Sequence, residues 1–211
     1  MKPSIVYLHG FASGPASKKA RYFARQFAAE GIAVDIPDLA EGRFESLTLT
    51  GQLQVIEKTA AGRNVSLIGS SLGGYLAALY AARHPAQVDR VVLLAPGFGF
   101  AQRWPVSLGE EKLQRWQTEG VLPFFHYGEG REMLLRYDLI RDGCQYEAYP
   151  AVTQPCLIFH GVNDTVVPAE WSREFAAAKP NVELHLEQSD HELLNILEPM
   201  WQRTRAFLTQ P

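Results

Sequence analysis

The stretch VSLIGSSLGGYLAAL, residues 65–79, decides the fold, because it runs from an apolar strand-like segment directly into an alanine-rich helical one. Its centre, Gly69-Ser70-Ser71-Leu72-Gly73, matches G-x-S-x-G, the pattern of a tight strand-to-helix turn that exposes a nucleophilic serine. Such a turn strains the backbone, so the residues two before and two after the nucleophile must be almost free of side chain. This register selects Ser71 as the nucleophile. The alternative is a Gly/Ser turn that only lets the helix pack close to the strand.

Length and composition favour a single globular domain over residues 1–211. The chain has 46% hydrophobic and 20% charged residues, which excludes a disordered or fibrous protein. A net charge of −3 without Lys/Arg runs predicts neither a nucleic-acid partner nor a membrane partner. The apolar run near the N-terminus is too short for a signal peptide or a membrane span. Cys144 and Cys156 form no C-x-x-C pair, so we expect a reduced, cytoplasmic protein without a disulfide framework.

Six short strand-like runs alternate with helical patterns along the chain. Most of these runs are continuous in Val, Ile and Leu, which is typical of strands buried on both faces. The alternation predicts an α/β fold with a doubly wound, mostly parallel six-stranded sheet and helices on both faces. The expected strands are Ser4–Leu8, Ile32–Pro37, Asn64–Gly69, Arg90–Ala95, Pro155–His160 and Val182–Glu187. The expected helices are Ala16–Glu30, a weaker one near Leu49–Ile56, Leu72–Arg83, Ala169–Ala178 and Glu192–Leu208, the last kinked or divided at Pro199.

The segment 97–154 interrupts this alternation, since it is much longer than one crossover needs. It is rich in aromatic residues, and two short amphipathic patterns predict helices near Glu110–Thr118 and Arg131–Arg141. The segment leaves the sheet at the edge where such folds bind ligands, so we expect a small helical cap over a substrate pocket. The alternative is an elaborated crossover with its own small core. Four aromatic residues either line the pocket or pack within the core and the cap: Tyr75, Phe98, Trp104 and Trp116.

A serine hydroxyl needs a base to accept its proton, and six histidines are candidates. His191 alone follows the last strand, in the polar loop EQSDHEL. In a parallel sheet this loop emerges at the same edge as the Ser71 turn, so we expect His191 to be the base. Its alternative role is a capping contact to the last helix.

The base in turn needs an orienting carboxylate. Asp164 lies in the loop after the fifth strand, within FHGVNDTVVP, also at the carboxyl edge of the sheet. Asp190 is a rival, but it adjoins His191 and would have difficulty reaching round to it. Asp164 could instead form a turn that caps the next helix. The order Ser71, Asp164, His191 is that of the α/β-hydrolases and differs from that of the two best-known serine protease folds.

A tetrahedral intermediate carries an oxyanion that backbone N–H groups must stabilise. We expect one donor to be the amide of Leu72, which follows the nucleophile at the start of its helix. The second should come from the loop after the first strand, LHGFASGPASKKA, where the amide of Phe11 is best placed. His9 and Gly10 are expected to shape this loop rather than to take part in the chemistry.

The whole chain resembles the α/β-hydrolase superfamily. The segments YLHGFASGPASKKA and IGSSLGGYLAA are similar in particular to those of small bacterial YqiA/YcfP-type esterases. The resemblance implies a cofactor-free serine esterase that acts on small or medium acyl esters or thioesters. It also implies Ser71, Asp164 and His191 as the triad, with Phe11 and Leu72 at the oxyanion hole.

Other activities use the same side chains. A thioesterase, an acyltransferase, a peptidase and a C–C bond hydrolase all remain open, and a hydrolase fold kept as a non-catalytic ligand-binding module is a further alternative. The sequence has no H-E-x-x-H motif and no Cys/His spacing for a metal, so we expect neither a metal nor another cofactor. The oligomeric state is left open.

Overall fold

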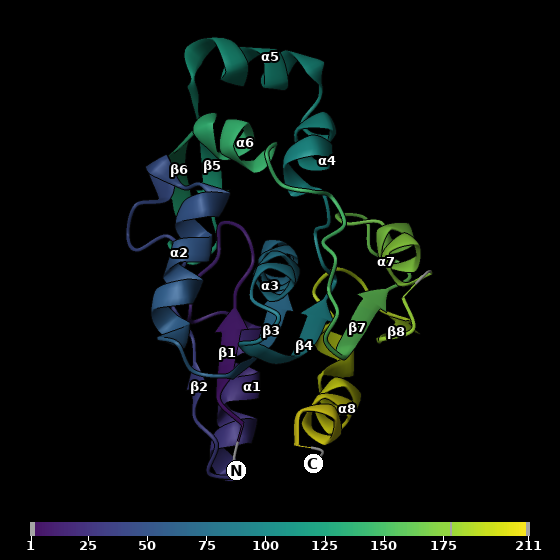
Figure 1. The fold of residues 1–211 in the computed structure, drawn as a ribbon. Helices are drawn as coiled ribbons and strands as arrows, with labels where there is room; N and C mark the ends of the chain where they lie inside the picture. The colour runs from purple at the N-terminus through teal and green to yellow at the C-terminus, as the bar shows by residue number, and fades with distance from the viewer. Residues whose placement is uncertain (1–2, 178, 210–211) are drawn as a thin grey trace.

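The computed structural model describes residues 3–177 and 179–209. Its central strands are β1 (Ile5–Leu8), β2 (Val34–Asp35), β3 (Val65–Ser70), β4 (Val88–Leu94), β7 (Cys156–Gly161) and β8 (Val182–Glu187). They form one sheet in the order β2-β1-β3-β4-β7-β8, and each pair of neighbours is parallel. The arrows of β1, β3, β4 and β7 point toward the segment at the top of Figure 1, so their carboxyl ends lie beneath it. The predicted six-stranded parallel sheet is therefore confirmed.

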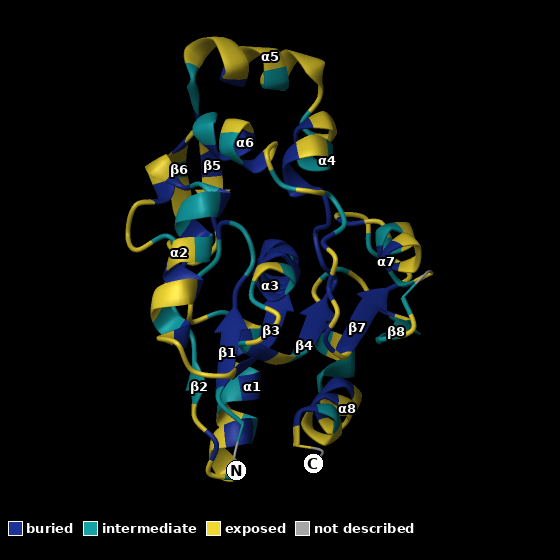
Figure 2. Ribbon diagram, in the orientation of Figure 1, coloured by how far each residue is buried: buried dark blue, intermediate teal, exposed yellow. Residues whose placement is uncertain are grey.

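Helices cover both faces of this sheet. They are α1 (Lys18–Ala29), α2 (Leu49–Ala60), α3 (Leu72–Arg83), α7 (Ala169–Ala176) and α8 (Leu197–Thr209), with the short 3-10 turns η1 (Phe44–Ser46) and η2 (Leu194–Ile196). Successive side chains of a strand point to opposite faces. Val6 and Leu8 of β1 therefore join the core shared with α2 and α3, whereas Ile5 and Tyr7 join the core shared with α1 and α8. Strands β1, β3 and β7 are buried along their whole length between these layers, whereas the edge strands β2 and β8 are only partly buried (Figure 2).

Most predicted elements shift at an end by a few residues, and three of the differences matter for the fold. The second strand shortens to Val34–Asp35, a half-buried pair at the sheet edge. The helix expected at Ala169–Ala178 ends at Ala176, and position 178 lies outside the described residues. In the last helical region η2 precedes α8, and Pro199 lies in the first turn of α8, where its missing N–H breaks no helical hydrogen bond. Across the described part of the chain, no helix has the length and apolar character needed to cross a membrane.

The cap contains a β-hairpin as well as helices. Its elements are α4 (Phe100–Ser107), α5 (Glu110–Glu119), β5 (Val121–His126), β6 (Arg131–Arg136) and α6 (Asp138–Gly143). The prediction of a helix over Arg131–Arg141 is wrong, because residues 131–136 pair antiparallel with β5. Met133 and Leu135 are the inward positions of β6, and in so short a segment their spacing fits a strand as well as a helix. The turn between the strands ends in Gly130, whose φ of 67° favours glycine.

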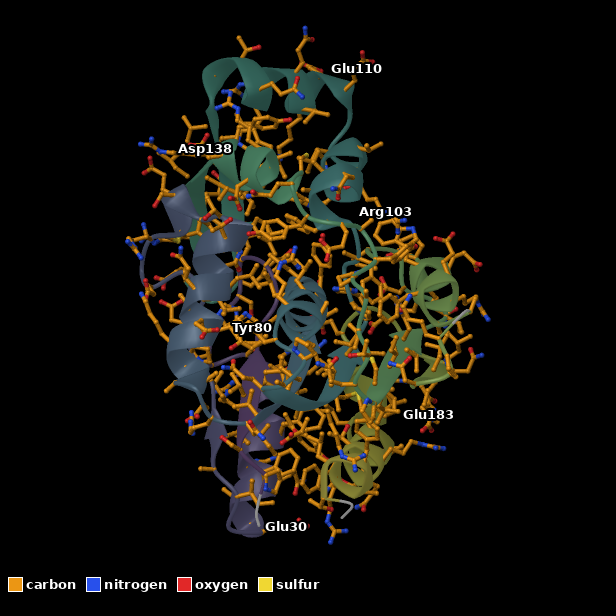
Figure 3. The ribbon with its side chains drawn as sticks, viewed as in Figure 1. Glu30, Tyr80, Arg103, Glu110, Asp138 and Glu183 are labelled. Carbon is orange, nitrogen blue, oxygen red and sulfur yellow. The ribbon has the colours of Figure 1, made fainter. Side chains whose placement is uncertain are left out.

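Arg103 of α4 joins the cap to the body of the protein beside α7 (Figure 3). Its guanidinium donates hydrogen bonds of 3.0 Å to the hydroxyl of Tyr149, and it lies 4.4 Å from the centre of the Trp171 ring of α7. Cation–π contacts of this kind hold two surfaces together without burying an unpaired charge. The cap is thereby attached to the layer that also carries the loop after β7.

Candidate active site

The turn after β3 has the geometry that the glycine spacing requires. Ser71 has φ 55° and ψ −120°, a conformation that side-chain-bearing residues rarely adopt, and α3 begins immediately after it. A Cβ added to Gly69 would lie 2.3 Å from the carbonyl oxygen of Gly73, and one added to Gly73 would lie 2.2 Å from the carbonyl oxygen of Leu8. Both glycines are therefore needed for α3 to start so close to the ends of β1 and β3. The strain at Ser71 is typical of a functional position.

The structure brings the three side chains expected to act together into one chain of contacts. His191 Nε2 lies 3.0 Å from Ser71 Oγ, and His191 Nδ1 lies 2.7 Å from Asp164 Oδ2. Because the carboxylate can only accept, Nδ1 carries the hydrogen and Nε2 is free to accept the hydroxyl proton of Ser71. The Asp164 side chain is fully buried, whereas 21% of the His191 side chain is exposed. The imidazole of His191, which would receive the proton, is thus accessible, and the carboxylate of Asp164 is shielded from water.

Three loops at the carboxyl edge of the sheet carry these residues. They follow β3, β7 and β8, and β7 and β8 are parallel neighbours in the sheet. A Cβ on Gly161, the last residue of β7, would lie 2.3 Å from the carbonyl oxygen of Ser189. Glycine at this position therefore lets the loop that carries His191 pack directly against the end of β7. The rival Asp190 accepts hydrogen bonds from the backbone N–H groups of Glu192 and Leu193 in its own loop.

Asp164 is surrounded by hydrogen-bond donors. Oδ1 accepts from the N–H groups of Val166 at 2.8 Å and Val167 at 2.7 Å, and Oδ2 faces His191 and, at 3.3 Å, His160 Nε2. Burial alone would raise the pKa of this carboxyl, but the hydrogen bonds from His160, His191 and the backbone outweigh it, so its pKa lies well below the ordinary value. Asp164 is therefore ionised at neutral pH and is suited to stabilise a positive imidazolium.

Replacing Asp164 with asparagine should make the free energy of unfolding change less with pH in the acid range. A carboxyl whose pKa is lowered by folding stabilises the native state above its unfolded value, about 4, and this contribution disappears as the pH falls through the lower native value. The free energy of unfolding of the parent should therefore exceed that of Asp164→Asn most at neutral pH, and the gap should narrow below about pH 5. Urea unfolding of both proteins at a series of pH values measures this difference in the free energy of unfolding. A difference that does not change with pH would contradict a lowered pKa of Asp164 in the folded protein.

The loop after β1 is held on two sides. His9 accepts a hydrogen bond from the N–H of Leu39 through Nε2, and burial lowers its pKa, so it shapes the loop as a buried neutral ring. A Cβ on Gly10 would lie 3.4 Å from the Cβ of Ser71, which places the start of this loop against the turn after β3. The carbonyl of Ala12 accepts a 2.7 Å hydrogen bond from the N–H of Tyr127 in the cap hairpin.

The Phe11 side chain fixes the same loop to the cap. Its ring lies against those of Phe44, Phe100, Trp104 and Phe124, with ring centres 4.8 to 6.3 Å apart. Phe11 directly follows Gly10, whose backbone lies against Ser71, and Leu72 is the first residue of α3 after Ser71. Their role as oxyanion donors stays a prediction.

The four aromatic residues proposed for substrate binding occupy different environments. Trp104 is partly buried, stacks on Phe100 and contacts the Phe11 ring at a tilt. The other three are fully buried: the Tyr75 hydroxyl donates to the carbonyl of Glu147, Phe98 stacks on Phe175, and the Trp116 ring N–H donates to the carbonyl of Leu135. Trp104 is therefore the one of the four whose ring is not fully buried.

Sequence reasoning missed Lys19, whose Nζ lies 3.5 Å from the carbonyl oxygen of His191. Burial lowers the pKa of its ammonium group to about 8, against the opposing effect of Glu192, Asp164 and Asp190. In the sequence, only its place beside Ala20 in an apolar helical pattern distinguishes this lysine, and the structure puts it near the start of α1. Within residues 3–177 and 179–209, no three His, Cys, Asp or Glu side chains are arranged to hold a metal ion.

Comparisons with known proteins agree with this fold. Mouse palmitoyl-protein thioesterase ABHD10, mitochondrial, is 25% identical over 210 residues, which cover 90% of this chain and 69% of the relative. Mouse monoacylglycerol lipase ABHD6 is 30% identical over 106 residues, or 45% of this chain and 31% of the relative. The protein is thus similar to hydrolases that include a thioesterase and a lipase.

Solved structures with the α/β-hydrolase fold superpose on nearly the whole chain. Mouse α/β hydrolase domain-containing protein 10 has a TM-score of 0.81 and 22% identity, and the match covers 99% of this chain and 90% of that one. Est1E from Butyrivibrio proteoclasticus has a TM-score of 0.76 and 20% identity, covering 98% and 87%. The predicted α/β-hydrolase fold is confirmed. A family model described as uncharacterised protein family UPF0227 matches residues 4–209, and the chain belongs to that family.

Proposed function

We propose that this protein is a serine hydrolase that cleaves carboxylic esters of small or medium acyl chains through an acyl-enzyme. The proposal depends above all on one observation, the continuous contact from Asp164 Oδ2 to His191 Nδ1, at 2.7 Å, and from His191 Nε2 to Ser71 Oγ, at 3.0 Å. A serine hydroxyl is a weak nucleophile until a base within hydrogen-bond reach accepts its proton. Here the base is in reach and a buried carboxylate orients it.

In the first half of the reaction Ser71 Oγ attacks the ester carbonyl carbon while its proton moves to His191 Nε2. The C–O bond to the alcohol then breaks, and His191 returns the proton to the departing alkoxide, so that an alcohol leaves and an acyl-Ser71 ester remains. Asp164 stays ionised and stabilises the imidazolium through the Nδ1 hydrogen bond. No cofactor is needed for this step.

In the second half a water molecule attacks the acyl-enzyme. His191 accepts a proton from the water and then donates it to Ser71 Oγ, which releases the carboxylic acid. In both halves the carbonyl oxygen becomes negative, and the amides of Leu72 and Phe11 would donate to it. Leu72 is the first residue of α3, where a helix leaves N–H groups without helical partners and favours negative charge.

The substrate class is argued from the groups around Ser71. The Trp104 ring packs against that of Phe11, the residue proposed to supply an oxyanion donor, and aromatic surface at such a place would suit an apolar acyl group rather than a charged one. A thioester is the second candidate, because the same attack and proton transfers cleave it and because the mouse relative is named a palmitoyl-protein thioesterase. The unpaired Cys144 and Cys156 accord with the reducing cytoplasm as the proposed location.

A panel of substrates with a covalent probe tests the proposal. A fluorophosphonate should label Ser71, as found by mass spectrometry of the digested protein, and should abolish hydrolysis in proportion to labelling. p-Nitrophenyl esters of rising acyl length and the matching acyl thioesters then separate the two substrate classes. A parent protein that is folded, remains unlabelled and hydrolyses none of these substrates would support the non-catalytic alternative.

A further inference from the structure

A second histidine, His160, lies behind the proposed active site. It is the residue before the end of β7 and is fully buried. Both nitrogens of its ring have partners: Nδ1 lies 2.7 Å from the hydroxyl of Ser172 in α7, and Nε2 lies 2.8 Å from the carbonyl oxygen of Val167. A buried ring bonded at both nitrogens has one fixed orientation.

The Val167 contact assigns the hydrogen on this ring. A carbonyl oxygen only accepts, so His160 Nε2 must carry a hydrogen. The same nitrogen lies 3.3 Å from Asp164 Oδ2, the oxygen that faces His191. The Nε2–H group of His160 is therefore close to two acceptors, the carbonyl oxygen of Val167 and Asp164 Oδ2.

His160 also contacts Val167, three residues after Asp164 in the same loop. The N–H of Val167 donates to Asp164 Oδ1, while the carbonyl of Val167 accepts from His160. The residues from Asp164 to Val167 are thus fixed at both ends, and Val167 itself is buried. A carboxylate held in this way keeps Oδ2 aimed at His191 without help from substrate.

We propose that His160 is a positioning residue for Asp164, and that Ser172 sets the orientation of His160. This inference rests on the proposed function, since it concerns the carboxylate that orients the proposed base. The physical reason is that Asp164 accepts hydrogen bonds in a dry site, where a small rotation would exchange the His191 contact for another donor. His160 opposes that rotation because its Nε2 also lies 3.3 Å from Oδ2 and its own ring is fixed by Ser172 and Val167.

His160→Leu removes the donor, and His160→Gln retains an amide donor that reaches the place of Nε2. We expect His160→Leu to lower kcat about 100-fold with KM almost unchanged, because a displacement of about 1 Å near the reacting groups costs about that factor. His160→Gln should recover most of the loss. His185→Leu in the adjacent strand is the matched control, since His185 bonds Glu183 and stacks on Phe159 away from Asp164.

A readout independent of hydrolysis keeps this inference separate from the proposed function. The low-field proton resonance of His191 Nδ1–H reports its hydrogen bond to Asp164 in any folded protein. It should move or broaden in His160→Leu, return in His160→Gln and stay unchanged in His185→Leu. If the parent hydrolyses no ester, the proposed function fails while this resonance still tests the positioning.

The inference is overturned if His160→Leu retains the parent kcat or the parent resonance, or if His160→Gln is as impaired as His160→Leu. Should His160→Leu not fold, Ser172→Ala decides. It removes one hydroxyl and should still shift the His191 resonance and lower kcat. A folded Ser172→Ala with the resonance and kcat of the parent would refute the orienting role.

Discussion

Replacing Ser71 with alanine is expected to lower kcat for p-nitrophenyl acetate by at least about 10⁴-fold, because removal of a triad nucleophile typically costs several orders of magnitude. Ser71 Oγ is the atom 3.0 Å from His191 Nε2, and without it the base has no hydroxyl to deprotonate. The variant should also lose all labelling by a fluorophosphonate. Both effects follow from one missing oxygen, so they should appear together.

The fold should survive this change, since alanine keeps the Cβ and the backbone N–H of Ser71 still donates to the carbonyl of Leu94. Ser70→Ala is the matched control, because it removes a hydroxyl from the preceding residue, the buried last residue of β3. Steady-state kinetics and thermal unfolding of the parent and both variants measure the outcome. A Ser71→Ala protein that hydrolyses the ester at the parent rate would eliminate the proposed mechanism.

The turn after β3 and the sheet around it could be predicted because their causes are local. Gly69 and Gly73 are required by contacts within a few residues and with one neighbouring strand, and continuous apolar runs such as Val65–Ile68 have no stable place except a strand buried on both faces. The position of His191 beside Ser71 was also predictable, since parallel topology brings the loops after β3 and β8 to one edge. In these cases chain order and residue type together determine the position.

The remaining features depend on contacts that the sequence does not encode locally. Residues 131–136 become a strand because β5 provides a partner, although their apolar spacing also fits a helix. Trp116 and Phe98 are aromatic residues of the cap that the structure buries, and composition cannot distinguish a pocket wall from a small core. His160 is visible in the sequence only as a histidine before a glycine. Its contact with Asp164 depends on the path of the loop from Asp164 to Val167.

Adding a methyl group at Gly73 is expected to have the largest effect on stability of any single change in the turn. The Cβ of Gly73→Ala would lie 2.2 Å from the carbonyl oxygen of Leu8 and 2.5 Å from that of His9. Both are backbone atoms of the β1 end, so no side-chain rotation relieves the overlap, and α3 must move away from the sheet. We expect a loss of at least about 3 kcal/mol in the free energy of unfolding, at the upper end of overpacking effects.

Two other glycines give a graded comparison for this prediction. A Cβ on Gly74 would lie 3.1 Å from its nearest neighbours, and a Cβ on Gly14 would meet no atom within 4 Å. The order of destabilisation measured by urea unfolding should therefore be Gly73→Ala, then Gly74→Ala, then Gly14→Ala. Since the displaced α3 carries the amide of Leu72, any Gly73→Ala protein that folds should also hydrolyse esters more slowly than Gly14→Ala. A Gly73→Ala protein as stable and as active as Gly14→Ala would show that α3 does not start against the end of β1.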